Sequence, residues 1–180
     1  MLILASQSPR RRELLTMAGI DFTCVPSHFE EVIPAHANVP DIPRLLALGK
    51  ARDVFSSHPE DTVLGSDTIV AYGDTVLGKP KSEEDAFGML RLLSGKTHYV
   101  HTGVAILSPS GEESFVSSTE VEFYELTDDE IRAYIATGEP MDKAGAYAIQ
   151  GKGFRFVKAI RGDYYTVMGL PLAETVRRLP

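Results

Sequence analysis

Short apolar runs alternate along this chain with segments whose apolar residues recur at helical spacing, and this alternation most restricts the fold. The runs predict strands, and the periodic segments predict helices that cover the sheet. Turns at Gly73-Asp74 and at Ser108–Gly111 predict hairpins, so the sheet is expected to be mixed rather than all parallel. The predicted fold class is α/β, a mixed twisted sheet with flanking helices. The predicted strands are 2–5, 22–25, 62–65, 69–72, 75–77, 99–107, 114–124 and 154–160, and the predicted helices are 9–18, 44–57, 82–94, 127–137 and one beginning near Pro171.

Two of these helices carry recognisable start signals. Ser82-x-x-Asp85 and Thr127-x-x-Glu130 fit the capping pattern in which a hydroxyl accepts a hydrogen bond from the backbone three residues later. Both patterns come directly before residues with helical periodicity. We therefore expect capped helices at these two positions.

The length and composition favour an ordered chain. Its 180 residues suit a single domain over 1–180, or two small lobes around a cleft. Hydrophobic residues make up 43% and charged residues 24%, which is far from the low hydropathy and high charge of disordered chains. We expect order throughout.

The charge balance restricts the partners. A net charge of −7 argues against binding to a nucleic-acid polymer, which needs a large basic face. No apolar run approaches the roughly 18 residues of a membrane-spanning helix, and no signal peptide is recognisable. Cys24 is the single cysteine, which excludes an internal disulfide, and we expect its thiol to be buried. These features predict a cytoplasmic protein without nucleic-acid or membrane partners.

A candidate phosphate-binding turn follows the first predicted strand. Ser8 is a candidate N-cap and Pro9 the first helical residue. The free N–H groups of a helix N-terminus, joined by the side chains of Ser6, Ser8, Arg10 and Arg11, can hold phosphate oxygens. An ordinary capped helix with solvated arginines explains the motif equally well. The strand directly before it favours phosphate binding.

Asp67 lies where an apolar run ends, and a carboxylate at a strand end is a frequent catalytic position. It can bind a divalent cation or take a proton from an attacking water. Glu31 is a candidate second metal ligand, and Lys50 and Lys79 are candidates for neutralising phosphate charge. Taken alone, Asp67 is more typical of a turn than of a catalytic position, and the other three residues are more typical of solvated surfaces. Their convergence is a hypothesis.

A glycine-rich stretch, 142–153, is the third candidate element. Glycine lets a backbone approach a flat or anionic ligand, and the amide of Gln150 offers a donor and an acceptor to the edge of a base. The alternative is that Gly145 and Gly151 only permit tight turns and that Gln150 is merely exposed.

Several familiar chemistries have no motif here. The chain has no Walker sequence, no GxGxxG, no CxxC and no HExxH. Neither Ser6 nor Ser8 lies in a nucleophile context, and His98 and His101 are expected on a strand surface. Metal-assisted hydrolysis is therefore the simpler hypothesis.

Five ordered blocks make the chain similar to the Maf family of nucleotide pyrophosphatases over nearly its whole length. The blocks are LASQSPRRRELL at 4–15, GSDTIV at 65–70, GKP at 78–80, DKAGAYAIQG at 142–151 and GDYYTVMGLPL at 162–172. The resemblance implies a fold similar to inosine triphosphatases, with two lobes around a central cleft. It also implies hydrolysis of a nucleoside triphosphate to the monophosphate and pyrophosphate, a divalent cation (Mg²⁺ or Mn²⁺), and a homodimer as a family-level expectation.

Within the family, the chain resembles the branch acting on dTTP and UTP, since the 7-methyl-GTP branch typically carries Glu where Gln150 stands. Modified pyrimidine nucleotides, 7-methyl-GTP and a non-catalytic regulator of cell division remain the alternatives. The roles that the resemblance implies are as follows: Asp67 as proton acceptor or metal ligand, Arg10 and Arg11 as phosphate or specificity arginines, Thr68 and Gln150 as specificity positions, and Ser6, Glu31, Lys50 and Lys79 as polar cleft residues.

Two positions depart from the family pattern. Ala148 stands where Gly is usual, and Ser66 where Ala is common. A side chain at position 148 would disturb the loop only if its backbone required a positive φ.

Overall fold

The computed structural model describes all 180 residues, and the chain forms two compact units. Unit 1 comprises Met1–Thr68, Thr102–Ser117 and Gly169–Pro180, and unit 2 comprises Ile69–His101 and Ser118–Met168. Two units agree with the two lobes that the resemblance implies, while the single domain over 1–180 and the central cleft stay predictions.

One sheet of seven strands carries the fold, in the order β2-β1-β3-β5-β6-β7 with β4 paired to β3. The strand β1 is parallel to β2 and β3, whereas β4 is antiparallel to β3 and β7 to β6, which confirms the predicted mixed sheet. The strands are β1 (Leu2–Leu4), β2 (Thr23–Cys24), β3 (Thr62–Tyr72), β4 (Thr75–Leu77), β5 (Thr97–Ser108), β6 (Gly111–Phe123) and β7 (Val157–Arg161). The α-helices are α1 (Pro9–Met17), α2 (Ile42–Phe55), α3 (Glu83–Leu93), α4 (Asp128–Ile135), α5 (Tyr164–Met168) and α6 (Leu172–Arg178), and the 3-10 helices are η1 (Val39–Asp41), η2 (Glu139–Asp142), η3 (Ala144–Ala146) and η4 (Lys152–Phe156).

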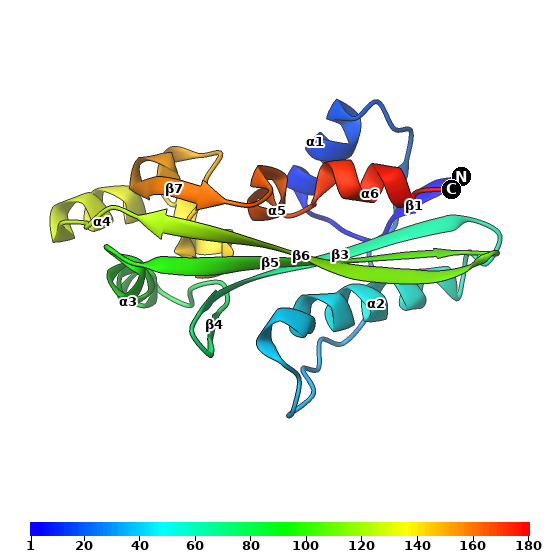
Figure 1. The fold of residues 1–180 in the computed structure, drawn as a ribbon, viewed down its shortest axis with the longest axis horizontal. Helices are drawn as coiled ribbons and strands as arrows, with labels where there is room; N and C mark the ends of the chain where they lie inside the picture. Colours follow the sequence, from blue (N-terminus) through cyan, green and yellow to red (C-terminus); the bar gives the residue numbers. More distant parts are fainter. The chain divides into compact units, whose positions relative to one another are not determined.

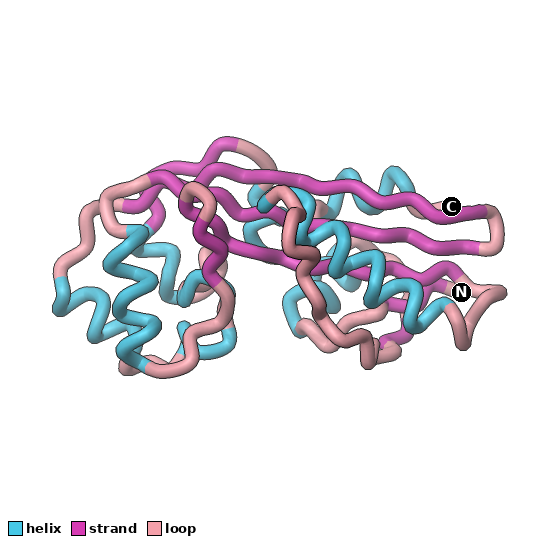
Figure 2. The backbone as a smooth tube through the Cα atoms, turned by 90° about the horizontal axis from the view of Figure 1, so that it is seen from below, coloured by secondary structure: helices cyan, strands magenta, loops and turns pink.

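In unit 1, helices cover both faces of the sheet. The helix α2 lies on one face, and α1 and α6 lie on the opposite face (Figure 1; Figure 2). The apolar side of α2 packs on β1, β3 and β5, because its residues at helical spacing meet the buried faces of these strands. The cluster consists of Ile3, Ala5, Ala47, Leu48, Ala51, Val54, Val63, Ala105 and Leu107.

Unit 2 has its own core between α3, α4 and the strands. At its centre Phe123 packs edge-on against Tyr147, with ring centroids 4.8 Å apart. Both predicted caps are present: the hydroxyl of Ser82 accepts a hydrogen bond from the Asp85 N–H, and Thr127 and Glu130 form a full capping box. No helix of the chain is long and apolar enough to cross a membrane.

Three boundaries differ from the sequence-based expectation. The run that begins at Thr62 does not end before Asp67, because β3 continues without interruption to Tyr72. A five-residue helix, α5, follows Asp163 where no helix was predicted; Oδ2 of Asp163 accepts the N–H of Thr166, as a capping side chain does. The last strand starts at Val157, since η4 occupies the residues before it.

Three burial predictions were wrong. His98 and His101 are 1% and 5% exposed. His98 lies between the exposed Thr97 and Tyr99, on the face of β5 that packs against Phe123 and Tyr147 in the core of unit 2. His101 is covered by the stacked ring of Tyr99. His98 Nε2 lies 2.7 Å from Oη of Tyr147. Cys24 is exposed, since it belongs to the two-residue edge strand β2.

Candidate active site

A lysine bridges two carboxylates in unit 1. The Nζ of Lys50 lies 2.6 Å from Oδ1 of Asp67 and 2.8 Å from Oε1 of Glu31. The side chains of Lys50 and Asp67 are 17% and 13% exposed, while that of Glu31 is 54% exposed. Three of the predicted residues therefore do come together, although they lie on α2, on β3 and in the loop before η1.

Two glycines explain this convergence. A side chain at Gly65 would place its Cβ 2.4 Å from the carbonyl oxygen of Ala47, so β3 and α2 approach closely only because Gly65 has none. A Cβ at Gly49 would lie 2.3 Å from the ring of Phe29. The first contact brings α2 against β3 two residues before Asp67, and the second seats the loop that carries Glu31 beside α2.

Hydrogen bonds secure the same loop. Oδ2 of Asp53, on α2, accepts the hydroxyl of Ser27 at 2.9 Å and the N–H of His28 at 2.7 Å. The hydroxyl of Ser27 in turn accepts the N–H of Phe29 at 3.0 Å. The loop is thus tied to α2 just before Glu31. Glu31 was predicted from sequence, but these contacts were not.

The environment of Asp67 suits a proton acceptor. Burial raises the pKa of Asp67 above its ordinary value, while the positive charges of Lys50 and Arg11 and the hydrogen bond from Lys50 oppose the rise. A carboxylate with a raised pKa holds a proton more firmly and is a better general base.

Arg11 is held by three hydrogen bonds. Its Nε–H donates to the carbonyl oxygen of Gly169 at 2.8 Å, Nη1 donates to Oγ of Ser6 at 3.2 Å, and Nη2 donates to Oγ1 of Thr68 at 3.2 Å. Burial lowers the pKa of Arg11, and the charge of Asp67 opposes this, but a guanidinium stays charged in proteins. Three of its five N–H groups are used, so two remain for an anion.

The first turn of α1 is not an ordinary serine cap. Ser8 occupies the N-cap position, but its side chain makes no capping hydrogen bond. The Oγ of Ser6 accepts the N–H of Ser8 at 3.1 Å as well as Arg11, so the hydroxyl proton of Ser6 is directed elsewhere. Arg10 is half-buried on the first turn of the helix. This arrangement favours anion binding over the capped-helix alternative.

Two residues of this site had no predicted role. Oγ1 of Thr102, on β5, lies 2.9 Å from Oγ1 of Thr68. The carbonyl of Gly169 accepts the hydroxyl of Ser66 at 3.2 Å in addition to Arg11. Ser66 thus has a hydrogen-bonding function that Ala could not supply. Gly169 lies within the last family block, which was the only sequence signal for it.

The remaining predicted residues, Lys79 and Gln150, belong to unit 2, and both are exposed. Gln150 is in a turn, and the only non-glycine residue with a positive φ is Ala146, at 62°. Ala148 therefore causes no strain in the loop, which removes the concern raised by its departure from the family pattern.

The donor set near Lys50 is compatible with Mg²⁺ or Mn²⁺. No group of three or more His, Cys, Asp or Glu side chains in the chain could hold a metal. Mg²⁺, however, is usually bound by one or two carboxylates together with substrate phosphates and water. Asp67 and Glu31, which share one ammonium group, are such a pair.

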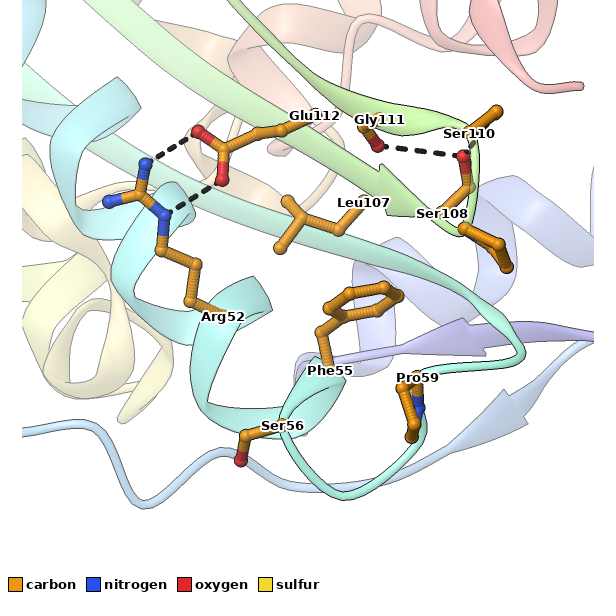
Figure 3. Close-up of a pocket in the computed structure, with 10 residues that line it drawn as sticks. Arg52, Phe55, Ser56, Pro59, Leu107, Ser108, Ser110, Gly111 and Glu112 are labelled. Carbon is orange, nitrogen blue, oxygen red and sulfur yellow. Dashed lines mark hydrogen bonds and ion pairs between the residues drawn. The ribbon is translucent and has the colours of Figure 1, made fainter.

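A pocket of about 740 Å³ lies elsewhere in unit 1, beside the end of α2 and the β5–β6 turn. Phe55 and Leu107 form its apolar part, and Arg52 donates two hydrogen bonds to Glu112 at its edge, at 2.8 and 2.5 Å (Figure 3). None of the predicted site residues lines it. The polar cluster around Asp67 therefore remains the candidate active site.

Comparisons with known proteins agree with the five sequence blocks. The family described as "Maf-like protein" matches residues 1–180. A dTTP/UTP pyrophosphatase of Geobacillus sp. (strain WCH70) is 54% identical over 178 residues, covering 99% of this chain and 96% of that protein. A dTTP/UTP pyrophosphatase of Bacillus cytotoxicus is 56% identical over 177 residues, covering 98% and 93%. Among solved structures, the Staphylococcus aureus Ham1 protein aligns with 68% of this chain and 71% of its own at 14% identity and a TM-score of 0.47, a likeness too distant to carry an argument.

Proposed function

The chain belongs to the Maf family, and on that premise we propose that it is a nucleoside triphosphate pyrophosphatase that converts dTTP and UTP to the monophosphate and pyrophosphate. The observation that carries the proposal is the pairing of Asp67 with Lys50 in unit 1, on the same unit as the anchored guanidinium of Arg11. Anhydride cleavage needs an oriented base and neutralised phosphate charge, and these three groups supply both.

Asp67 acts as the general base. Lys50 occupies its Oδ1, so Oδ2 is the oxygen that takes the proton from the attacking water. The water oxygen bonds to the α-phosphorus, the bond from that phosphorus to the bridging oxygen breaks, and pyrophosphate leaves. The raised pKa of Asp67 favours the proton transfer.

Arg11 and Ser6 bind phosphate oxygens. Arg11 is fixed before substrate arrives, so its two remaining N–H groups cost little to order when they meet an anion. Ser6 directs its hydroxyl proton, and α1 its free N–H groups, to the same anion. Ser8 and Arg10 complete this binding turn.

Asp67 and Glu31 would hold the divalent cation, Mg²⁺ or Mn²⁺. When bound, the cation supplies charge neutralisation for the phosphate oxygens. When the divalent cation is not bound, the ammonium group of Lys50 lies between the two carboxylates and keeps them at a fixed separation.

Further residues contact the nucleobase and the leaving pyrophosphate. The family motifs support roles for Thr68 and Gln150 in selecting the nucleobase, and for Lys79 in neutralising charge on the departing pyrophosphate. The net charge of −7 supports action on free nucleotides rather than on nucleic acid. The single cysteine, Cys24, supports a cytoplasmic location, and a homodimer is proposed from the family alone.

A nucleotide panel tests the proposal. Purified protein is incubated with dTTP, UTP, CTP, ATP, GTP and 7-methyl-GTP, each with Mg²⁺, with Mn²⁺ or with a chelator, and pyrophosphate is measured. Release from dTTP and UTP that depends on metal is expected, and Asp67→Asn should bind dTTP without releasing pyrophosphate. Release of pyrophosphate from none of the nucleotides would contradict the proposal and favour a binding protein without catalysis.

A further inference from the structure

The loop that carries Gln150 is a closed turn. The N–H of Gly151 donates to the carbonyl oxygen of Ala148 at 3.2 Å, which makes Gln150 the third residue of a four-residue turn. The side chain before it, Ile149, is buried in the core of unit 2, whereas Gln150 is exposed. The direction of the Gln150 amide therefore depends on what holds this turn.

Two side chains from outside the turn hold its backbone on both sides. The Oη of Tyr134, on α4, accepts the N–H of Ala148 at 3.1 Å. The carboxylate of Glu139, on η2, accepts the N–H of Lys152 at 3.0 Å through Oε1 and the N–H of Gly153 at 3.2 Å through Oε2. The hydroxyl of Tyr134 also donates to Glu139. These hydrogen bonds thus form one connected network that holds the backbone before and after Gln150.

Close packing leaves this network little freedom. A Cβ at Gly151 would lie 2.3 Å from Oε1 of Glu139, and a Cβ at Gly153 would lie 2.7 Å from the carbonyl oxygen of Ala148 and 3.0 Å from Oη of Tyr134. Gly153 therefore leaves no room for a side chain beside the carbonyl of Ala148, and a side chain at Gly151 would displace the carboxylate of Glu139. The two glycines are not only turn residues.

Both holding residues are themselves fixed. Tyr134 is 5% exposed, and its ring packs edge-on against Phe156 with centroids 4.9 Å apart. Glu139 directly follows Gly138, whose φ of 75° ends the turn after α4. Burial would raise the pKa of Glu139, but hydrogen bonds from Tyr134, Lys152 and Gly153 outweigh it and lower the pKa, so the group is a carboxylate at neutral pH.

We propose that Glu139 and Tyr134 are positioning residues for base recognition, which hold the Ala148–Gly153 turn so that the Gln150 amide meets the edge of a pyrimidine base. This inference rests on the proposed function. It adds two residues that do not touch the substrate and act only through Gln150. Their effect should therefore appear in substrate discrimination and not in the chemical step.

The test compares Glu139→Gln and Tyr134→Phe with Gln150→Ala and with Glu120→Gln. Glu120→Gln is the matched control, because Glu120 lies in the same unit and accepts hydrogen bonds from Tyr99 and Arg161, away from the turn. Each positioning variant should raise KM for dTTP about ten-fold, the effect of losing one hydrogen bond to a charged or buried group, with kcat changed less than about three-fold. The preference for dTTP over GTP should narrow toward that of Gln150→Ala.

A double-variant cycle and amide hydrogen exchange complete the experiment. In a Gln150→Ala background, Glu139→Gln should change the dTTP preference no further, since the two residues act in series. Exchange at the amides of Lys152 and Gly153 should accelerate in Glu139→Gln and not in Glu120→Gln. Unchanged exchange, or an undiminished dTTP preference in both positioning variants, overturns the inference. A wild-type protein inactive on every nucleotide contradicts the proposed function instead, and the exchange data still decide whether Glu139 holds the turn.

Discussion

The Nζ of Lys50 lies 2.6 Å from Oδ1 of Asp67, and the same nitrogen lies 2.8 Å from Glu31. The proposed general base, Asp67, is thus paired with the ammonium group of Lys50, which is largely buried. Removing this cation would leave two carboxylates near each other without compensation, which raises the pKa of Asp67 further.

Lys50→Met should therefore shift the pH dependence of the reaction. Asp67 must be ionised to accept a proton, so a higher pKa moves the acidic limb of the kcat/KM profile to higher pH. The measurement is kcat/KM for dTTP between pH 5 and pH 9. Lys96→Met is the control, since Lys96 lies over the ring of Tyr72 and not beside a carboxylate of the site. An acidic limb at the wild-type position would show that Lys50 does not set the pKa of Asp67.

Asp67→Asn should make the protein more stable while it removes turnover. The folded-state pKa of Asp67 is raised, so its stabilising contribution is complete below the unfolded-state pKa and is lost as pH rises through the folded-state pKa. The asparagine side chain does not ionise, so the variant does not lose this stability at neutral pH. We expect Tm at pH 7.5 to rise by about 2 to 4 °C, equivalent to about 1 kcal/mol for a chain of this size. The gain should shrink at pH 4, and a gain equal at both pH values would argue against this origin.

Arg11→Lys should lower kcat/KM for dTTP by about 100-fold, although the charge is kept. Lysine cannot reproduce a planar fork that donates to Gly169, Ser6 and Thr68 at once. The control is Arg12→Lys, because Arg12 is exposed on the same helix. An unchanged kcat/KM in Arg11→Lys would mean that charge alone matters at this turn, and equal losses in the two variants would argue against a specific role for the hydrogen bonds of Arg11.

Two helix glycines should respond oppositely to alanine. Gly88 on α3 has open space where a Cβ would be added, so Gly88→Ala should raise stability by about 1 kcal/mol through helix propensity. Gly49 on α2 meets the ring of Phe29 at 2.3 Å, so Gly49→Ala should displace that loop and with it Glu31. Urea unfolding measures the stability of Gly88→Ala. The displacement of Glu31 is tested by the Mg²⁺ concentration for half-maximal activity, which should rise for Gly49→Ala and not for Gly88→Ala.

His98 should make the protein sensitive to acid. Burial lowers the pKa of His98 to about 4 from 6.5, its Nδ1 has no hydrogen-bond partner, and its Nε2 meets Tyr147. Its contribution to stability is complete above the unfolded-state value and is lost as pH falls through the folded-state value. Between pH 7 and pH 4 the wild-type protein should lose about 3 kcal/mol more than His98→Gln, measured by urea unfolding. Parallel losses in the two proteins would refute the assignment.

Local sequence patterns were sufficient for most helices and strands. The capping box at Thr127 and Glu130 and the proline at Pro9 act through residues three or four positions away, so they can be read without knowledge of the fold. The burial of His98 could not be read in this way, because it depends on which face of β5 packs against the core of unit 2.

The sequence by itself determined the family, through five ordered blocks, and it identified Asp67, Lys50 and Glu31 as candidates. Only the tertiary structure decided that these three meet, since the contact requires Gly49 and Gly65 to admit Phe29 and the backbone of α2. It also decided that Arg11 is fixed by the carbonyl of Gly169, 158 residues further along the chain. The physical reason is that caps and periodicity act between near neighbours, whereas a site is assembled by packing between segments whose separation in sequence carries no such signal.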